Sequence, residues 1–119
     1  MAQPNIINLS TILGNTAFLN VTTVSTNVVA NPASSGSAYK INSLIVANVD
    51  GTNSADITAS IFRGGVENKI ASTVTVPADA TLVIISKDTS IYLEEGDYMQ
   101  LLASADNDLW ATCSYEDLR

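Results

Sequence analysis

The stretch YKINSLIVANVDGTNSADITASIF, residues 39–62, decides the fold class. Its first half alternates in side-chain type with a period of two, which predicts a strand over 39–49. Leu44 and Val46 add apolar side chains to the second face, which is typical of a central strand covered on both sides. Asp50-Gly51 then predicts a turn into a hairpin partner. The face of the first strand is predicted to hold Tyr39, Ile41, Ser43, Ile45, Ala47 and Val49, and the inward face of the partner Ile57, Ala59 and Ile61.

Short runs rich in Val, Ile and Thr recur outward from this stretch, with Gly, Pro, Asn and Asp between them. Such spacing is typical of antiparallel sandwiches, and no helical period is longer than a turn. We therefore predict an all-β protein: an antiparallel β-sandwich, jelly-roll or Ig-like, of about seven or eight strands. The further strands are predicted over 18–29, 69–76, 82–86, 90–93, 98–103 and 109–115, with Arg63-Gly64-Gly65 as a turn before the second of them.

The first 16 residues differ from the rest of the chain. They hold large apolar side chains among Asn, Ser and Thr, without strict alternation. We expect residues 1–16 to form an edge strand or an N-terminal arm, and residues 17–119 to form the sandwich domain. An exposed apolar arm normally needs a partner, so these side chains are predicted to form a subunit interface: Ile6, Ile7, Leu9, Ile12 and Leu13.

Composition narrows the chemistry. The chain has 119 residues, 12 acidic and 5 basic residues, no histidine, and a net charge of −7. Such acidity disfavours nucleic acid and anionic membranes as partners. Without histidine there is no Ser-His-Asp or Cys-His arrangement. The single Cys113 is expected to be a buried apolar residue, and neither a cofactor nor a metal is predicted. The start of the chain has no basic region typical of a secretory signal, so we expect synthesis in a reducing cytosol.

Carboxylates remain as candidates for a site. Glu94-Glu95-Gly96-Asp97 lies between two apolar runs, and we expect a turn with its charges in water rather than a reaction centre. Asp50, Asn53 and Asp56 miss the spacing of a calcium loop, so we expect a turn there as well. An aromatic platform for sugar, made from Trp110, Tyr115, Tyr98 and Tyr92, is the remaining alternative.

Three pieces of the chain resemble a known group of proteins: YKINSLIVANVDGTNSADITASIF, TVTVPADATLVIISKDTSIYLEEGDYMQL and WATCSYEDL. In this group a strand of the first kind leads to a hairpin, a VPA turn precedes an apolar strand, and L-E-x-G-D precedes the next strand. Over residues 38–118 the chain is similar to small tailed-phage virion proteins of the kind found in phages of marine bacteria and cyanobacteria.

The resemblance implies an all-β, non-enzymatic structural component of a bacteriophage virion, assembled in the host bacterial cytoplasm. It carries no active site. We expect a capsid decoration (cement) protein that stabilises the head, working as a homotrimer or other symmetric oligomer and contacting the major capsid protein or other virion proteins. The alternatives are a tail, neck or fibre-associated virion protein, and a host-carbohydrate-binding module.

Overall fold

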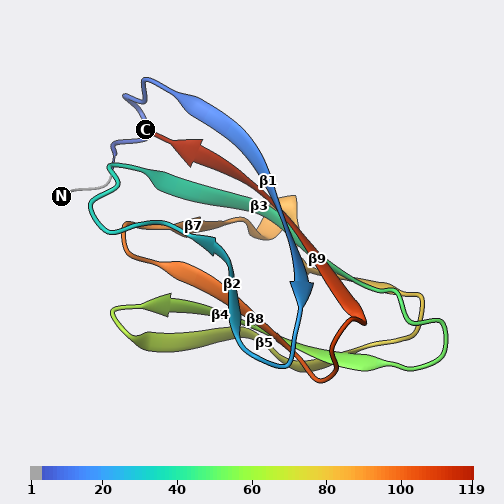
Figure 1. The fold of residues 1–119 in the computed structure, drawn as a ribbon. Coiled ribbons are helices and arrows are strands. Elements are labelled where there is room, and N and C mark those ends of the chain that lie inside the picture. Colours follow the sequence, from blue (N-terminus) through green and yellow to red (C-terminus); the bar gives the residue numbers. More distant parts are fainter. Residues whose placement is uncertain (1–3) are drawn as a thin grey trace.

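The computed structural model describes residues 4–119, and in this part of the chain nine strands form two antiparallel sheets packed face to face (Figure 1). The predicted all-β sandwich is therefore confirmed. The strands are β1 (Ile12–Val21), β2 (Thr26–Ala30), β3 (Ala38–Asn48), β4 (Ala55–Arg63), β5 (Val66–Val76), β6 (Thr81–Ile85), β7 (Ile91–Leu93), β8 (Tyr98–Ala103) and β9 (Leu109–Leu118).

The strand order identifies the sandwich as a jelly roll rather than an Ig-like fold. Sheet A has the order β1-β9-β3-β6, with β7 also paired to β3, and sheet B has the order β2-β8-β4-β5. The pairs β4–β5, β3–β6/β7, β2–β8 and β1–β9 enclose one another, as in a long antiparallel hairpin rolled into two sheets.

Strands β6 and β7 share one position in sheet A. β6 pairs with Leu44–Ala47 of β3, and β7 pairs with Tyr39–Ile41 of the same strand. Between them lies a single 3₁₀ turn, η1 (Lys87–Thr89), in which the Thr89 amide donates to the Ser86 carbonyl at 3.0 Å. The nine strands thus occupy eight positions.

The core lies between the sheets and is built from side chains at alternate positions. Sheet A contributes Val21, Ile41, Leu44, Val46, Ile85, Leu93, Leu109, Ala111 and Cys113; sheet B contributes Val29, Ala55, Ile57, Ala59, Val76, Met99, Leu101 and Ala103. The buried positions of Ile57 and Ala59 agree with the predicted inward face of the second strand.

The predicted faces of β3 are wrong in one respect. Ile41 and Leu44 both point into the core, although strict alternation would place them on opposite faces. The pairing with β9 skips Asn42, because Ile41 lies opposite Tyr115 and Ser43 opposite Ser114. A bulge of one residue inverts the phase of the strand. Ile45 and Ala47 consequently lie on the outer face, away from Ile41.

Two connections also differ from the prediction. The single strand expected over 18–29 is two strands, because the chain turns at Thr22–Ser25 and passes from sheet A to sheet B. Likewise, Asp50-Gly51 does not close a hairpin: β3 and β4 lie in opposite sheets, and the turn carries the chain between them. By contrast, Gly64-Gly65 does close the β4–β5 hairpin, with φ of 58° and 79°, as the primed hairpin turn requires.

Candidate interaction surfaces

The charged turn between β7 and β8 holds one end of the sandwich together. Gly96 has φ of +85°, which confirms that residues 94–97 form a turn. Asp97, however, is 1% exposed rather than in water as predicted. Its carboxylate accepts hydrogen bonds from Arg63 Nε at 3.0 Å, from Arg63 Nη2 at 2.7 Å and from the Glu94 amide at 2.9 Å. The hydrogen bond with Asp97 is the main cause that raises the pKa of Arg63.

The other two carboxylates of this turn also bond to protein groups. Glu94 Oε2 accepts a hydrogen bond from Arg63 Nη2 at 2.7 Å, and Glu95 Oε2 accepts one from the Gly36 amide at 2.6 Å. Buried Asn31 completes the junction, since its side-chain amide donates to the carbonyls of Ser37 and Leu93. The three carboxylates therefore fix the loop before β3 against the end of β4, which is a structural task.

The predicted turn at Asp50 is stabilised by its own backbone. The Asp50 carboxylate accepts hydrogen bonds from the amides of Thr52 and Asn53, and these two bonds lower its pKa. Asp56 instead accepts a hydrogen bond from the Thr75 hydroxyl at 2.8 Å. Among residues 4–119, no group of three or more acidic, Cys or His side chains could hold a metal ion.

Cys113 is buried in the core on β9, as predicted. Burial raises its pKa to about 12, so the thiol stays protonated at neutral pH. Only the thiolate is an effective nucleophile, and Cys113 is therefore a packing residue in the folded protein.

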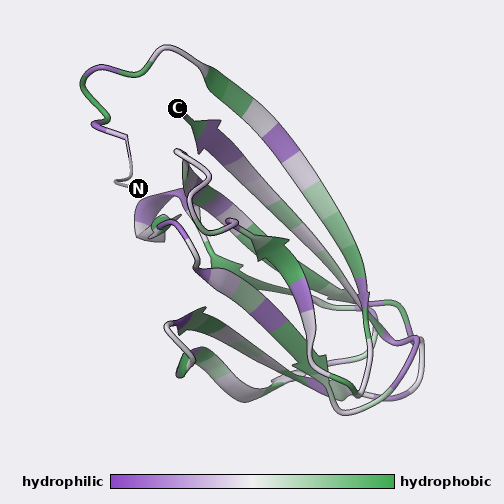
Figure 2. Ribbon diagram, turned by 60° about the vertical axis from the view of Figure 1, so that its left-hand side comes forward, coloured by the Kyte–Doolittle hydropathy of each residue, from purple (hydrophilic) through white to green (hydrophobic). Residues whose placement is uncertain are grey.

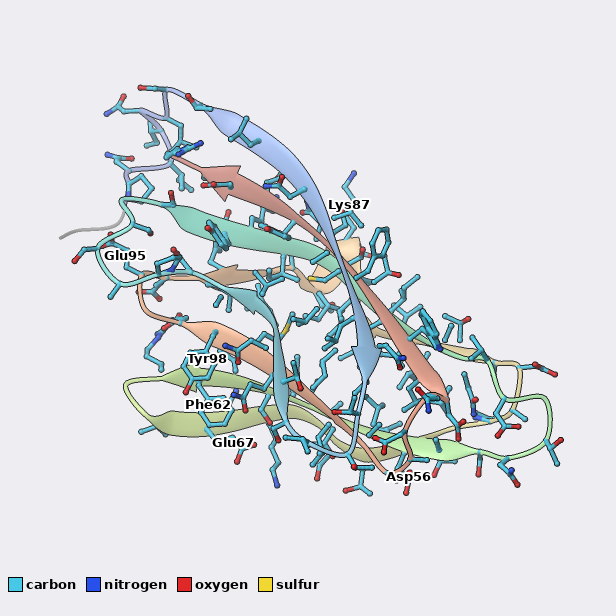
Figure 3. All side chains as sticks on the ribbon, in the orientation of Figure 1. Asp56, Phe62, Glu67, Lys87, Glu95 and Tyr98 are labelled. Atoms are coloured by element: carbon cyan, nitrogen blue, oxygen red, sulfur yellow. The ribbon has the colours of Figure 1, made fainter. Side chains whose placement is uncertain are left out.

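The aromatic side chains proposed for sugar binding are dispersed over the molecule. Tyr115 lies against Tyr39, with ring centroids 5.2 Å apart, while Tyr98 stacks on Phe62 at 5.0 Å. Figure 3 shows the Phe62–Tyr98 pair on sheet B. Trp110 and Tyr115 lie on β9 and Tyr92 on β7, all in sheet A, whereas Tyr98 lies on β8 of sheet B, so the four side chains of this alternative do not share one face.

The five apolar side chains of the N-terminal segment all lie at or near the surface. Ile7 is 86% exposed, and Ile6 and Ile12 are more than half exposed, while Leu13 is 40% exposed and Leu9 is half-buried. Ile12 and Leu13 begin edge strand β1, so the strand crosses the expected boundary at residue 16. Figure 2 shows the apolar start of β1 at the margin of the molecule. The chain is held at this point because Thr11 and Arg119 exchange backbone hydrogen bonds.

Ile6 also lines a shallow hollow at the end that carries the charged turn. This hollow, of about 270 Å³, is bounded by Pro4, Ala38, Tyr92 and Glu94 as well. A second hollow, of about 420 Å³, shares Tyr92 and extends to the β4–β5 hairpin, where Val66 is exposed. One hollow is therefore lined in part by Arg63 and the other by Glu94, so both adjoin the charged turn.

The outer face of sheet A carries exposed apolar side chains, and the sequence analysis did not predict an interaction surface there. Directly opposite one another across four strands lie Phe18, Thr112, Ile45 and Val83. We call Phe18, Ile45 and Val83 the outer apolar row. Phe18 is 79% exposed and Val83 57% exposed, and half-exposed Trp110 lies beside the row. Side chains of different strands align only through the register, so sequence alternation identified single positions and not the row.

A helix long and apolar enough to cross a membrane does not occur in the described part of the chain.

Comparison with known proteins finds solved structures that share the fold, but it does not show a family for the chain. No protein-family model matches the chain, and no curated protein matches it by sequence. Among solved structures, a protein of the Bacillus endospore appendages, described as a novel family of disulfide-linked pili, has a TM-score of 0.55 at 16% identity and covers 99% of this chain and 96% of its own.

A chain of the acid-stable capsid of Helicobacter pylori bacteriophage KHP30 has the same TM-score of 0.55 at 10% identity, covering 94% of this chain and 90% of its own. At such low identity the likeness concerns the fold, and a fold by itself assigns no function. The chain thus has nearly the whole sandwich in common with one pilus protein and one phage capsid protein.

Proposed function

We propose that this protein is a non-enzymatic structural subunit of a bacteriophage virion, and within the virion a capsid decoration (cement) protein that braces the head. The observation that carries the proposal is the distribution of exposed apolar side chains on the sandwich. The carboxylates of the charged turn, by contrast, are hydrogen-bonded within the chain itself. Phe18, Val83 and Trp110 lie on the outer face of sheet A, and Ile6 and Ile7 lie on the N-terminal segment.

Such surfaces favour a protein that is covered by neighbours in its working state. Contiguous apolar patches on soluble monomers are small, and larger ones mark sites of association. In a symmetric shell, each subunit repeats the same contact many times, so modest contact free energies add up. The fold likeness to a phage capsid chain supports this reading.

The contact we assign to the particle is the N-terminal segment together with the two hollows that meet at Tyr92. Ile6 and Ile7 would be buried against the major capsid protein or another virion protein, while the Arg63–Asp97 contact keeps the underlying loops in place. Burying each isoleucine would contribute roughly 1.5 to 3 kcal/mol before the cost of association.

A particle-binding assay tests the proposal. Purified virions that lack the protein are incubated with the intact chain, with Ile6→Ser/Ile7→Ser, and with a matched control, Thr52→Ser/Asn53→Ser, on the exposed loop at the other end of the sandwich. The intact chain and the control are expected to bind, and the isoleucine variant to bind weakly. Binding by the isoleucine variant at full strength would overturn the assignment of this surface.

Copy number separates the head from the rest of the virion. Quantitative electrophoresis of whole particles should give a copy number comparable to that of the major capsid protein. The likeness to a pilus protein favours, as the second candidate, a tail, neck or fibre-associated virion protein. A copy number equal to that of the tail or neck proteins would establish this candidate instead.

A further inference from the structure

The four edges of the two sheets are not equally protected. An unprotected edge strand offers unpaired N–H and C=O groups to another strand, and natural proteins block such edges with bulges, charges, short strands or interruptions. In sheet B, β2 has five residues and a shift of register between Asn27 and Val29. β5 carries Glu67 and Lys69, is irregular in its pairing with β4, and has Thr73 at φ of 50°.

In sheet A, the edge formed by β6 and β7 is interrupted by η1, which leaves strands of five and three residues. β1 differs from all three. It has ten residues, ILGNTAFLNV, without a charge or a proline, and it pairs with β9 in unbroken register over its whole length. Among residues 4–119, no strand pairs with the other side of β1, and Figure 1 shows it at the outer margin of the sandwich.

The first half of β1 also projects beyond the core. Residues 13, 17, 19 and 21 point to the same side, where Val21 is fully buried, yet Leu13 is 40% exposed. Ile12, on the opposite side, is 59% exposed. A regular edge strand that is apolar on both faces gains buried surface as well as backbone hydrogen bonds when another strand joins it.

We propose that β1 pairs in antiparallel orientation with β1 of a second copy of this chain, around a twofold axis perpendicular to sheet A. The other three edges of a second copy are blocked, which leaves β1 as the edge able to receive β1. The chain has a net charge of −7, so electrostatic repulsion opposes contact between two copies. Strand β1 carries no charged residue, and it is therefore a surface at which two copies can approach each other.

Under this pairing, a basic residue at the start of each β1 comes toward an acidic residue at the end of the other. At its start, Arg119 is exposed and its amide donates to the Thr11 carbonyl at 3.0 Å. At its end, the Asp106 carboxylate accepts a hydrogen bond from the Thr23 amide at 2.8 Å. Antiparallel pairing brings the Arg119 end of each copy, where β9 also carries Glu116 and Asp117, to the Asp106 end of the other. A parallel pair would instead bring the two Asp106 carboxylates to the same end.

The register follows from the faces. Opposite residues of an antiparallel pair point to the same side, and a slip by one residue would turn Phe18 toward the core side. Even-numbered residues must therefore lie opposite even-numbered ones, and of the two central registers that satisfy this we assign the one that places Thr16 on the axis, directly opposite Thr16 of the second copy. The outer apolar rows of the two copies would then lie on one face of a continuous sheet.

The first test measures the mass of the purified chain by analytical ultracentrifugation over a wide concentration range. The intact chain of 12.5 kDa is expected to form a dimer. Thr16→Lys, at an exposed position of β1, should weaken this association about tenfold, because like charges directly opposite each other are unfavourable. Ser72→Lys, at an exposed position of edge strand β5, is the matched control and should dimerise as the intact chain does.

The second test uses cross-linking, in a Cys113→Ala background. Thr16→Cys should form a covalent dimer under mild oxidation, since Cα atoms of opposite residues lie within disulfide reach, whereas Ser72→Cys should not. A chain that stays monomeric, or a Thr16→Lys variant that dimerises with full affinity, would overturn the proposal. Neither test involves the virion, so a failure of dimerisation would not count against the proposed function, which the particle-binding assay tests. Likewise, a failure of particle binding would not count against pairing through β1.

Discussion

Arg63, at the end of β4, and Asp97, directly before β8, form a two-point contact across 34 residues of sequence. Arg63 Nε lies 3.0 Å from Asp97 Oδ1, and Arg63 Nη2 lies 2.7 Å from Asp97 Oδ2. The carboxylate is 1% exposed, whereas the arginine side chain is 60% exposed. The buried Asp97 carboxylate therefore accepts its hydrogen bonds from a guanidinium group that reaches it from the surface.

Asp97→Ala is expected to lower the free energy of unfolding by about 1 to 3 kcal/mol, because the substitution removes the charged hydrogen bonds that a buried carboxylate makes. The donors at issue are Arg63 and the Glu94 amide. Urea denaturation measures the effect. Asp88→Ala, which removes an exposed carboxylate from η1, is the matched control and should change stability little. Equal effects of the two substitutions would contradict the role given to Asp97.

Gly96→Ala is expected to cost about 1 to 2 kcal/mol because an L side chain is strained at the φ of +85° found there. Gly51→Ala is the matched control: it lies in another exposed turn, without a positive φ, and its new methyl group would meet only Asp79 at ordinary contact distance. The same denaturation experiment compares the two. A neutral Gly96→Ala would show that the turn can adopt another conformation.

Stability should fall as the pH rises above about 9, and Cys113 is one cause. The folded protein raises the pKa of its thiol from 9.0 to about 12. Below pH 9 the thiol is neutral in both states and its contribution is fully present. Between 9 and about 12 only the unfolded chain releases this proton, so unfolding becomes more favourable by up to about 1.4 kcal/mol per pH unit.

Denaturation at a series of pH values measures this slope. Cys113→Ala should flatten it in part, because the raised pKa values of Tyr39 and Tyr115 act in the same direction. At pH 8 the thiol of the folded chain should resist an aromatic disulfide reagent and react once urea unfolds the protein. Rapid labelling of the folded chain would contradict the buried, protonated state.

Deleting residues 2–9 should leave a cooperatively melting sandwich. The deletion removes exposed Ile6 and Ile7 and half-buried Leu9, and it ends before Thr11, which bonds to Arg119. We expect a loss below about 2 kcal/mol, since little apolar surface is buried there. Deleting residues 2–21 removes β1 with core residue Val21, and this chain should not fold. Thermal melts followed by circular dichroism would distinguish the two, and an unfolded 2–9 deletion would place the segment in the core.

Trp110 offers a spectroscopic probe of the outer face of sheet A. It is the single tryptophan of the chain and is half-exposed beside the outer apolar row. In the isolated protein its fluorescence should be quenched readily by acrylamide. The contact assigned to the particle is the N-terminal segment with the two hollows, and Trp110 lines neither hollow, so particle binding should leave its emission and quenching unchanged. A shift of the emission to shorter wavelength with reduced quenching would show that the outer face of sheet A is covered as well, and would contradict the assigned contact.

Local features of the sequence predicted much of the fold. The period of two, the β-branched runs and the Gly-rich turns indicated an all-β sandwich, the β4–β5 hairpin and the bounds of β8. These succeed because strand formation and tight turns depend on neighbouring residues. The same local reasoning failed where one extra residue mattered: the bulge at Asn42 changed which side chains of β3 are buried.

Local sequence is sufficient to predict the alternation of side chains and the turns. It also limits the possible chemistry, because the chain has no histidine and a single cysteine. Which strands pair, and therefore which distant residues come into contact, depends on the three-dimensional fold. Asp97 is buried because Arg63 reaches it from another strand, and Phe18, Ile45 and Val83 form a row because three registers align them. Nested pairing depends on contacts between residues far apart in the chain, and no window of local sequence contains both partners.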